Sequence, residues 1–541
     1  MMDRRDFLRL AGMGCAFAFS STVLSGEADL ARGVRQARWV KSFGVEELTI
    51  TQLQALVDHG KASSVSLTKK YLARISAIDR RGPKLNAVIE LNPDALAIAG
   101  EMDHERMTKG RRGPLHGIPV LIKDNIDTHD RMTTTAGSLA LQGSIPPKDS
   151  FVVERLRAAG TVLLGKTNLS EWANFRGSLS TSGWSGRGGQ TRNPYALDRN
   201  PSGSSSGSAV AVSANLCAVA VGTETDGSIL SPSSFNGIVG IKPTLGLISR
   251  SGIIPIAHSQ DTAGPMGRTV SDAAILLGVL AGADPTDPDT APSATKAHKD
   301  YTPFLDPIGL RGTRLGVARN FFGFHPKVDE LMESALAEMK RAGAELIDPV
   351  PIPKPPELES AEIEVLRYEM KAHMNAYLAR LGSNAPVHTL QDIIAFNEKH
   401  RNQELKWFGQ EELIKSEAMG PLTEKAYAQA LAACRRFSRT EGIDRAMTEH
   451  RLNALIAPTS APAHITDWLL GDHGLGDSTT PAAVAGYPSI TVPAGLVYGL
   501  PVGISFFGLA WSEPMLLRIA FGFEQATKAR RPPRFLDAIE G

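Results

Sequence analysis

Apolar segments of strand length alternate with helical segments through the first half of the chain, and this alternation is the strongest constraint on the fold. The segment 117–123, GIPVLIK, is a short apolar run typical of a buried strand. Residues 151–167 contain a helix, a stop at Gly160 and a second apolar strand. Residues 206–224 repeat the pattern with a short helix that leads into a strand. Strands that alternate with helices predict an α/β fold, with helices on both faces of a sheet.

Segments outside this region extend the pattern. Residues 64–79 place five apolar side chains on one helical face, and Ser64 or Ser66 is a suitable N-cap. From about 355 to 450 the sequence changes to long helical stretches, which predicts a helical insertion. Strand signals return afterwards, so we expect a single large domain over residues 40–535. The other expected elements are strands at 85–91, 314–319, 453–458, 489–495 and 501–508, and helices at 271–282 and 514–527.

The N-terminus has the features of an export signal. Arg4 and Arg5 precede a Phe-Leu pair and a modest apolar stretch that reaches about Leu24. This order is typical of twin-arginine signals, which route folded proteins across the bacterial inner membrane. A basic amphipathic helix is the alternative. We therefore expect residues 1–28 to be an export segment and the protein to be periplasmic or secreted.

Composition narrows the range of partners. The 541 residues include 58 Lys and Arg against 57 Asp and Glu, a formal net charge of +1, which gives no electrostatic reason to expect nucleic acid. No apolar run approaches the roughly 20 residues of a membrane-spanning helix, so no stable membrane anchor is expected. The metal-binding patterns CxxC and HExxH are absent, and neither a metal nor another cofactor is expected. We expect the protein to be a monomer or a homodimer.

Three cysteines occur in the sequence. Cys15 falls in the expected export segment, and it lacks the preceding leucine of a lipoprotein signal. Cys217 and Cys434 remain in the mature chain, where they could form one disulfide or stay unpaired.

Two serine-rich segments and one lysine are the candidate functional residues. The segment 200–208, NPSGSSSGS, spells the G-x-S-x-G elbow at 203–207, but the preceding residues are polar and interrupted by proline instead of forming the strand that an elbow needs. Alone, this segment could be a flexible linker. The segment 222–229, GTETDGSI, follows an apolar run, and Lys123 ends another. Because lysines usually lie in solvent, one that closes a hydrophobic strand is a candidate for an amine with a perturbed pKa.

These segments belong to a longer set of motifs, PLHGIPVLIKDNIDT, GKTNLSEWA, RNPSGSSSGSAVAVSA, GTETDGSILSPSSFNGIVGIKPT and DTAGPMGRTVSDAAILL. The set resembles the amidase signature family over about 65–285, and the C-terminal strands resemble it more weakly over about 450–525. The spellings TETDGSI and SQDT are similar to those of bacterial peptide amidases within the family. The region 355–450 matches nothing that we can assign. The resemblance implies the fold of the family, a mixed, twisted β-sheet covered by helices on both faces.

The resemblance also implies a Ser–cis-Ser–Lys triad. Ser228 matches the nucleophile, Ser204 the bridging serine and Lys123 the base. Gly203 and Ser205 support the bridging serine, and the Gly203–Ser204 peptide bond is expected to be cis. The backbone N–H groups of Thr225, Asp226, Gly227 and Ser228 are the expected oxyanion hole.

General chemistry is consistent with a lysine base. A serine hydroxyl is a weak nucleophile until a base takes its proton. A free lysine, with a pKa of about 10.4, is almost entirely charged at pH 7, whereas burial can lower that value towards a useful 7–8. Such a lysine can act without histidine.

The sequence departs from the commonest family spelling, D-T-G-G-S-I-R, at three positions. Glu224 replaces the first acid, Asp226 replaces a glycine and Leu230 replaces the arginine. The usual acid–arginine support is therefore absent, and the partner of Glu224 stays open. Asp226 could cap an Asx turn, or it could recognise substrate N–H groups and disfavour free carboxylates.

We therefore expect an amidase that hydrolyses a carboxylic amide to carboxylate and ammonia through an acyl-enzyme on Ser228. C-terminal amides of peptides are the expected substrates. The alternatives are aryl, aliphatic or acyl amides, and a non-catalytic periplasmic peptide-binding protein.

Overall fold

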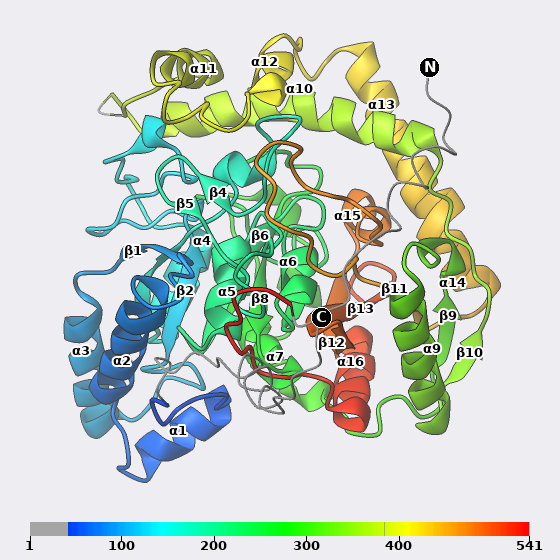
Figure 1. Cartoon of the computed structure of the whole chain (residues 1–541), viewed down its shortest axis with the longest axis horizontal. Coiled ribbons are helices and arrows are strands. Elements are labelled where there is room, and N and C mark those ends of the chain that lie inside the picture. Colours follow the sequence, from blue (N-terminus) through cyan, green and yellow to red (C-terminus); the bar gives the residue numbers. More distant parts are fainter. Residues whose placement is uncertain (1–41, 384, 540–541) are drawn as a thin grey trace, which may run out of the picture. The chain divides into compact units, whose positions relative to one another are not determined.

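A large mixed sheet organises the computed structural model, which describes residues 42–383 and 385–539 (Figure 1). The expected export segment, residues 1–28, lies outside the described residues. The strand order is β1-β3-β2-β6-β8-β7-β12-β13-β11-β9-β10. The strands of this sheet are β1 (Val88–Leu91), β2 (Pro119–Lys123), β3 (Val162–Thr167), β6 (Val219–Glu224), β7 (Val239–Lys242), β8 (Thr262–Gly267), β9 (Arg314–Val317), β10 (Glu345–Ile347), β11 (Ala454–Pro458), β12 (Ser489–Val497) and β13 (Leu500–Phe507). A separate pair joins β4 (Trp184–Ser185) and β5 (Gly189–Gln190).

Parallel and antiparallel pairing coexist in the large sheet. β2 pairs in parallel with β3 and β6, while β8 runs antiparallel to both β6 and β7. Every residue of β2, β3 and β6 is buried. Strands covered on both faces need near-continuous apolar sequence, which explains why these segments are recognisable in the chain.

Helices cover both faces of the sheet. Strand glycines show which helices lie on each face. A side chain added at Gly222 of β6 would meet Ser205 at the start of α5, and one at Gly240 of β7 would meet Ser233 of α6. A side chain added at Gly267 of β8 would instead meet α7, on the opposite face. The helices are α1 (Ile50–Asp58), α2 (Ser64–Arg74), α3 (Ala95–Lys109), α4 (Phe151–Ala158), α5 (Ser206–Ser213), α6 (Leu230–Phe235), α7 (Val270–Leu280), α8 (Ser293–Lys296), α9 (Pro326–Arg341), α10 (Pro356–Arg380), α11 (Leu390–Lys399), α12 (Glu411–Glu417), α13 (Lys425–Arg435), α14 (Asp444–Glu449), α15 (Thr480–Ala485) and α16 (Glu513–Thr527).

The predicted helical insertion is formed by α10 to α14. In Figure 1 the long helix α10 lies across one end of the view, with α11, α12 and α13 beside it. Its side chains Leu366, Met370 and Met374 pack into a core cluster with Trp172 and Ile256. The insertion is therefore part of the same domain as the sheet.

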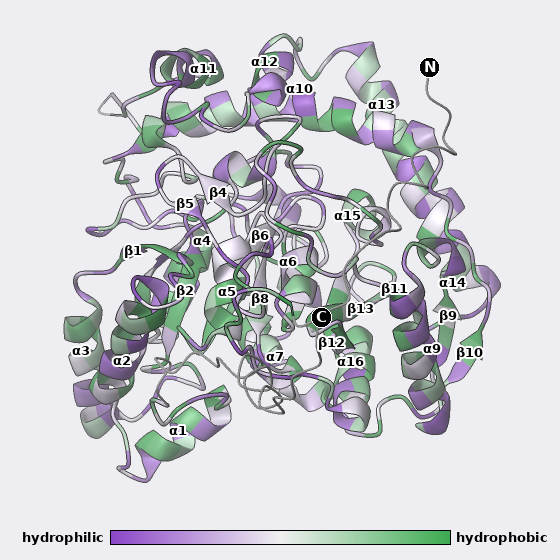
Figure 2. Ribbon diagram, viewed as in Figure 1, coloured by the Kyte–Doolittle hydropathy of each residue, from purple (hydrophilic) through white to green (hydrophobic). Residues whose placement is uncertain are grey.

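The structure confirms a single α/β domain with a large mixed sheet flanked by helices. The predicted elements occur with boundaries shifted by a few residues; for example, the strand expected at 85–91 begins at Val88. Strands β4, β5, β7, β8 and β10 were not predicted. Hydrophobic colouring is concentrated on β2 and α5 in Figure 2, whereas α9 carries much hydrophilic colouring.

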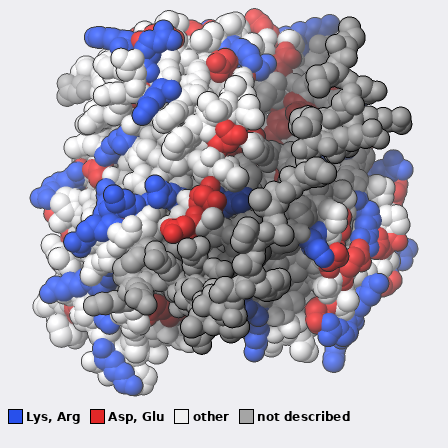
Figure 3. Space-filling model, in the orientation of Figure 1, with Lys and Arg blue, Asp and Glu red and all other residues white. Residues whose placement is uncertain are grey.

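Cys217 and Cys434 are both buried free cysteines, so the disulfide that the sequence left open does not form between them. Among the described residues, no helix has the length and apolar character to cross a membrane. Within the same residues, no three His, Cys, Asp or Glu side chains gather as a metal site would require. On the face that Figure 3 displays, basic and acidic side chains both occur.

Candidate active site

Lys123 ends β2 with its side chain fully buried. Its Nζ donates to Ser204 Oγ at 2.8 Å, to Thr223 Oγ1 at 2.8 Å and to the Thr223 carbonyl at 3.2 Å. Asn125 Nδ2 also donates to Thr223 Oγ1, at 3.0 Å. Because β2 and β6 are parallel neighbours, Lys123 and Thr223 lie at the same edge of the sheet, where open α/β sheets bind ligands.

Burial lowers the pKa of Lys123 from 10.5 to about 7, and the carboxylates of Asp261 and Glu224 offset part of this effect. A substantial fraction of the amine is therefore neutral at neutral pH. Asp261 is held in place by the Thr225 hydroxyl, at 2.6 Å, and by the backbone N–H groups of Ile256 and Ala257, both at 2.9 Å.

Ser204 lies in the loop that enters α5, and it is fully buried. The Gly203–Ser204 peptide bond is cis, as the resemblance implied. A side chain at Gly203 would come within 2.2 Å of Ser170 Oγ, so this position has room only for glycine. The Ser204 carbonyl accepts the N–H of Ser170 at 3.1 Å, which fixes the loop against the segment after β3.

Ser205 ties this loop to both neighbouring parts of the site. Its Oγ donates to the Thr223 carbonyl at 2.9 Å and accepts the Thr223 N–H at 3.1 Å. Its backbone N–H donates to the Ser228 carbonyl at 3.1 Å. Ser205 therefore supports the bridging serine, although it does not contact Lys123.

The segment from Thr225 to Ser228 forms the turn between β6 and α6. Gly227 has φ +73°, a conformation that favours glycine, and a side chain there would meet Thr479 Oγ1 at 3.0 Å. Within the described residues, the backbone N–H groups of this turn have no hydrogen-bond acceptor. These donors are thus available to a ligand. Ser228 is 8% exposed, and its hydroxyl forms no hydrogen bond with another described side chain.

The structure identifies the hydrogen-bond partners of Glu224, which the sequence did not reveal. Its Oε2 accepts the N–H groups of Ile229 at 2.6 Å and Leu230 at 2.9 Å, which anchors the chain just after Ser228. Burial raises the pKa of Glu224 to about 7, and the charge of Lys242 offsets part of the shift. Burial in turn lowers the pKa of Lys242 to about 8. Lys242 supplies the positive charge that Leu230 does not.

The structure contradicts one of the two interpretations of Asp226. The Asx-turn cap is wrong, because no backbone N–H of the described turn donates to this carboxylate, and its Oδ1 has no partner among the described residues. The hydroxyls of Thr479 and Thr480 lower the pKa of Asp226. Burial and the nearby Asp477 carboxylate raise its pKa. Asp226 thus links the turn to the N-terminus of α15.

The structure brings Lys123 and Ser204 into hydrogen-bond contact and connects the Ser204 loop to Ser228 through Ser205. Thr223, Asp261 and Lys242 were missed. Lys242 had a signal in the sequence, since it ends the apolar run GIVGIK as Lys123 ends GIPVLIK. Thr223 and Asp261 lie in the segments TETDGSI and SQDT, whose spellings are similar to those of peptide amidases.

Comparisons with known proteins agree with this fold. The amidase family model matches residues 66–517. The native peptide amidase of Stenotrophomonas maltophilia is 53% identical, with a TM-score of 0.86 over 91% of this chain and 100% of that chain. A peptide amidase in complex with the competitive inhibitor chymostatin is also 53% identical, with a TM-score of 0.87 over 90% of this chain and 99% of that chain. A probable amidase of Arabidopsis thaliana is 44% identical over 515 residues, 93% of this chain and 94% of the plant protein.

These matches define an amide-hydrolysing enzyme rather than a non-catalytic binding protein. The chain belongs to the amidase signature family.

Proposed function

We propose that the enzyme hydrolyses the C-terminal amide of peptides to a carboxylate and ammonia, with Ser228 as nucleophile, Ser204 as proton relay and Lys123 as base. The observation that carries this proposal is the 2.8 Å contact between a buried amine of pKa about 7 and Ser204 Oγ. The substrate class is supported by the 53% identity to a peptide amidase over nearly the whole of both chains.

Acylation begins with the neutral amine of Lys123. Its lone pair takes the Ser204 proton while Ser204 takes the proton of Ser228, whose oxygen attacks the amide carbon. The carbonyl oxygen then carries negative charge, which the free N–H groups of the turn at Thr225–Ser228 stabilise. A proton returning through Ser204 to the leaving nitrogen releases ammonia and leaves an ester on Ser228.

Deacylation uses the same groups in the same order. Water occupies the place that ammonia has left, loses a proton through Ser204 to Lys123, and attacks the ester carbon. Collapse of the second oxyanion returns the proton from Lys123 through Ser204 to Ser228 and releases the peptide acid. The acid then ionises to the carboxylate, and the released ammonia takes up its proton. No step requires a metal, since the lysine amine supplies the base.

Ammonia release across a panel of amides tests the proposed substrate. Peptides with a C-terminal amide, aryl amides, aliphatic amides and long acyl amides would be compared by kcat/KM. We expect the peptide amides to exceed the others by at least about tenfold, which corresponds to 1.4 kcal/mol of transition-state binding. A higher value for another class would assign the enzyme to that class.

Asp226 is proposed to disfavour the carboxylate product. At pH 8, Asp226→Asn should strengthen inhibition by the peptide acid about tenfold, because it removes a like charge within the catalytic turn, two residues before Ser228. The measurement is the inhibition constant of the peptide acid, with KM for the matching N-acetylated peptide amide as the control. Equal changes in both constants would contradict a charge-based role.

The location is also a proposal, in which Arg4 and Arg5 direct export of the folded enzyme. Replacing both by lysine keeps the positive charge but removes the twin-arginine pair. We expect the enzyme to move from the periplasmic to the cytoplasmic fraction of a bacterial host. Unchanged fractionation would show that the pair is not the signal.

A further inference from the structure

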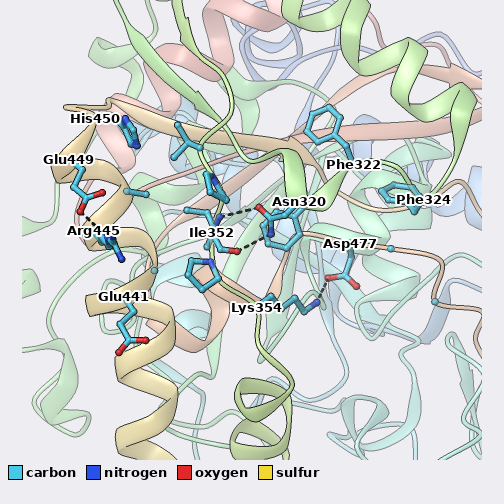
Figure 4. Close-up of a pocket in the computed structure, with 18 of the residues that line it drawn as sticks. Asn320, Phe322, Phe324, Ile352, Lys354, Glu441, Arg445, Glu449, His450 and Asp477 are labelled. Carbon is cyan, nitrogen blue, oxygen red and sulfur yellow. Dashed lines mark hydrogen bonds and ion pairs between the residues drawn. The ribbon is translucent and has the colours of Figure 1, made fainter.

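A second feature of the fold is a pocket of about 880 Å³ between the segment after β9, the segment 350–354, α14 and the loop 474–477 (Figure 4). We call it the Phe322 pocket. Its volume lies in the range of small-molecule sites, roughly 300–1,000 Å³. The Asn320 side chain holds one wall of the pocket in place. Its Nδ2 donates to the Ile352 carbonyl at 2.9 Å, and its Oδ1 accepts the Ile352 N–H at 3.0 Å.

The inner end of the Phe322 pocket adjoins the candidate catalytic turn. Asp477 lines the pocket, and its Oδ1 accepts from the N–H and the hydroxyl of Thr479, each at 3.3 Å. Thr479 in turn interacts with Asp226 and lies against Gly227. Asp477 and Thr479 therefore connect this end of the pocket to the turn that carries Ser228.

One wall of the pocket is apolar. Phe322, Phe324, Pro351 and Pro353 line it together with Leu475, whose side chain is 59% exposed. Gly476 lies so close to Phe324 that an added Cβ would come within 2.5 Å of the ring. This wall suits the apolar side chains of a bound peptide.

The charges at the inner end favour a cation. Lys354 lies 3.9 Å from Asp477, a longer separation than the 2.8 Å between Arg445 and Glu449 at the outer end (Figure 4). Asp226 adds a second carboxylate beyond Asp477, and the charge of Lys354 lowers the pKa of Asp226. A peptide with a free N-terminus brings a positive charge that complements this surplus of carboxylates.

We propose that the Phe322 pocket binds the residues of a peptide amide that precede the scissile amide, with apolar side chains on the Phe322–Leu475 wall and the N-terminal ammonium near Asp477. The inference rests on the proposed function and names the part of the substrate that the enzyme selects. The enzyme then prefers short peptide amides with a free N-terminus to single amino-acid amides.

Substrate length and two variants test this pocket. The substrates are N-acetyl-Leu amide, Leu-Leu-Leu amide and N-acetyl-Leu-Leu-Leu amide. For the wild type, we expect kcat/KM to rise about tenfold from the single residue to the tripeptide with a free N-terminus. Leu475→Ser should lower kcat/KM for both tripeptides roughly fivefold, mainly through KM, and leave the single residue unchanged. Asp477→Asn should lower kcat/KM about tenfold for Leu-Leu-Leu amide, whose N-terminus is free, and should leave kcat/KM for both acetylated substrates unchanged.

Matched controls come from a separate cavity between α9 and β12. Leu496→Ser alters an exposed leucine there, and Glu338→Gln alters a half-buried carboxylate that is ion-paired with Arg341. Neither variant should change any of the three values. A flat length series, or equal effects of Leu475→Ser on long and short substrates, would overturn the pocket assignment alone. If the wild type releases no ammonia from any peptide amide, the proposed function fails and the pocket assignment fails with it.

Discussion

A Ser228→Ala variant is expected to lose about 10⁴-fold or more of the amide-hydrolysing activity and to lose covalent labelling by a fluorophosphonate. Removal of a nucleophile leaves only binding and oxyanion stabilisation, which typically retain a small residue of the rate. The measurements are ammonia release and mass spectrometry of the labelled protein. Substrate binding should persist, because the change removes a single oxygen at a position that is 8% exposed.

Ser231 provides the matched control for labelling. It follows Ser228 by three residues, and its hydroxyl lies close to the same turn, 3.1 Å from the position that a Cβ on Gly227 would occupy. Ser231→Ala should label at the wild-type rate. Continued labelling of Ser228→Ala, or a loss of labelling in Ser231→Ala, would assign the nucleophile elsewhere.

Lys123→Met is expected to lower kcat by about 10³–10⁴-fold and to raise the free energy of unfolding at neutral pH. The activity falls because Ser204 loses the base at 2.8 Å, and general bases contribute on the order of 10²–10⁴-fold. The free energy of unfolding rises because the folded variant no longer buries an amine whose charged form is more stable in water. The measurements are steady-state kinetics and urea unfolding at several pH values.

The pH dependence of that stability follows from the lowered pKa. Between about 7 and 10.5 the unfolded chain binds a proton that the folded protein does not, so the wild type becomes more stable as pH rises through this window. The increase in the free energy of unfolding of Lys123→Met over the wild type is therefore greatest at pH 7 and below. It is on the order of 2 kcal/mol once the cost of the lost hydrogen bonds is subtracted. It should disappear towards pH 10.5. A variant that is less stable than the wild type at pH 6 would contradict this account.

Lys166→Met is the control for the loss of activity. Lys166 is also fully buried, on the neighbouring strand β3, but its Nζ donates to the Ile126 carbonyl at 2.7 Å and to Thr134 Oγ1 at 2.8 Å. It contacts neither candidate serine. We expect its variant to retain activity within about tenfold once folded protein has been confirmed by circular dichroism.

The sequence predicted the parts of the fold and the site that depend on local pattern. The buried strands β2, β3 and β6 are continuous apolar runs, and α2 places its apolar side chains on one face, so both are visible in short windows. Lys123 was found because a charged residue ends one such run. The contact between Lys123 and Ser204 follows from family motifs rather than from spacing, since 81 residues separate them.

Other features depend on residues that are distant in the chain. Strand β8 contains Gly264, Pro265 and Gly267, which are depleted in strands, and its neighbours β6 and β7 determine its conformation. The Asx turn at Asp226 was plausible locally, but Thr479 and Thr480 lie more than 250 residues away in the sequence and interact with that carboxylate instead. Tertiary contacts of this kind leave no local signal.

The most direct test of the lysine base is the protonation of Lys123 itself. Lysine labelled with ¹³C at Cε would be followed by NMR from pH 5 to pH 11, with the Lys123 signal assigned by its loss in Lys123→Met. The account predicts a midpoint at about pH 7. A midpoint near the ordinary value of 10.5 would leave the amine charged in neutral solution, and Lys123 could not then act as the base.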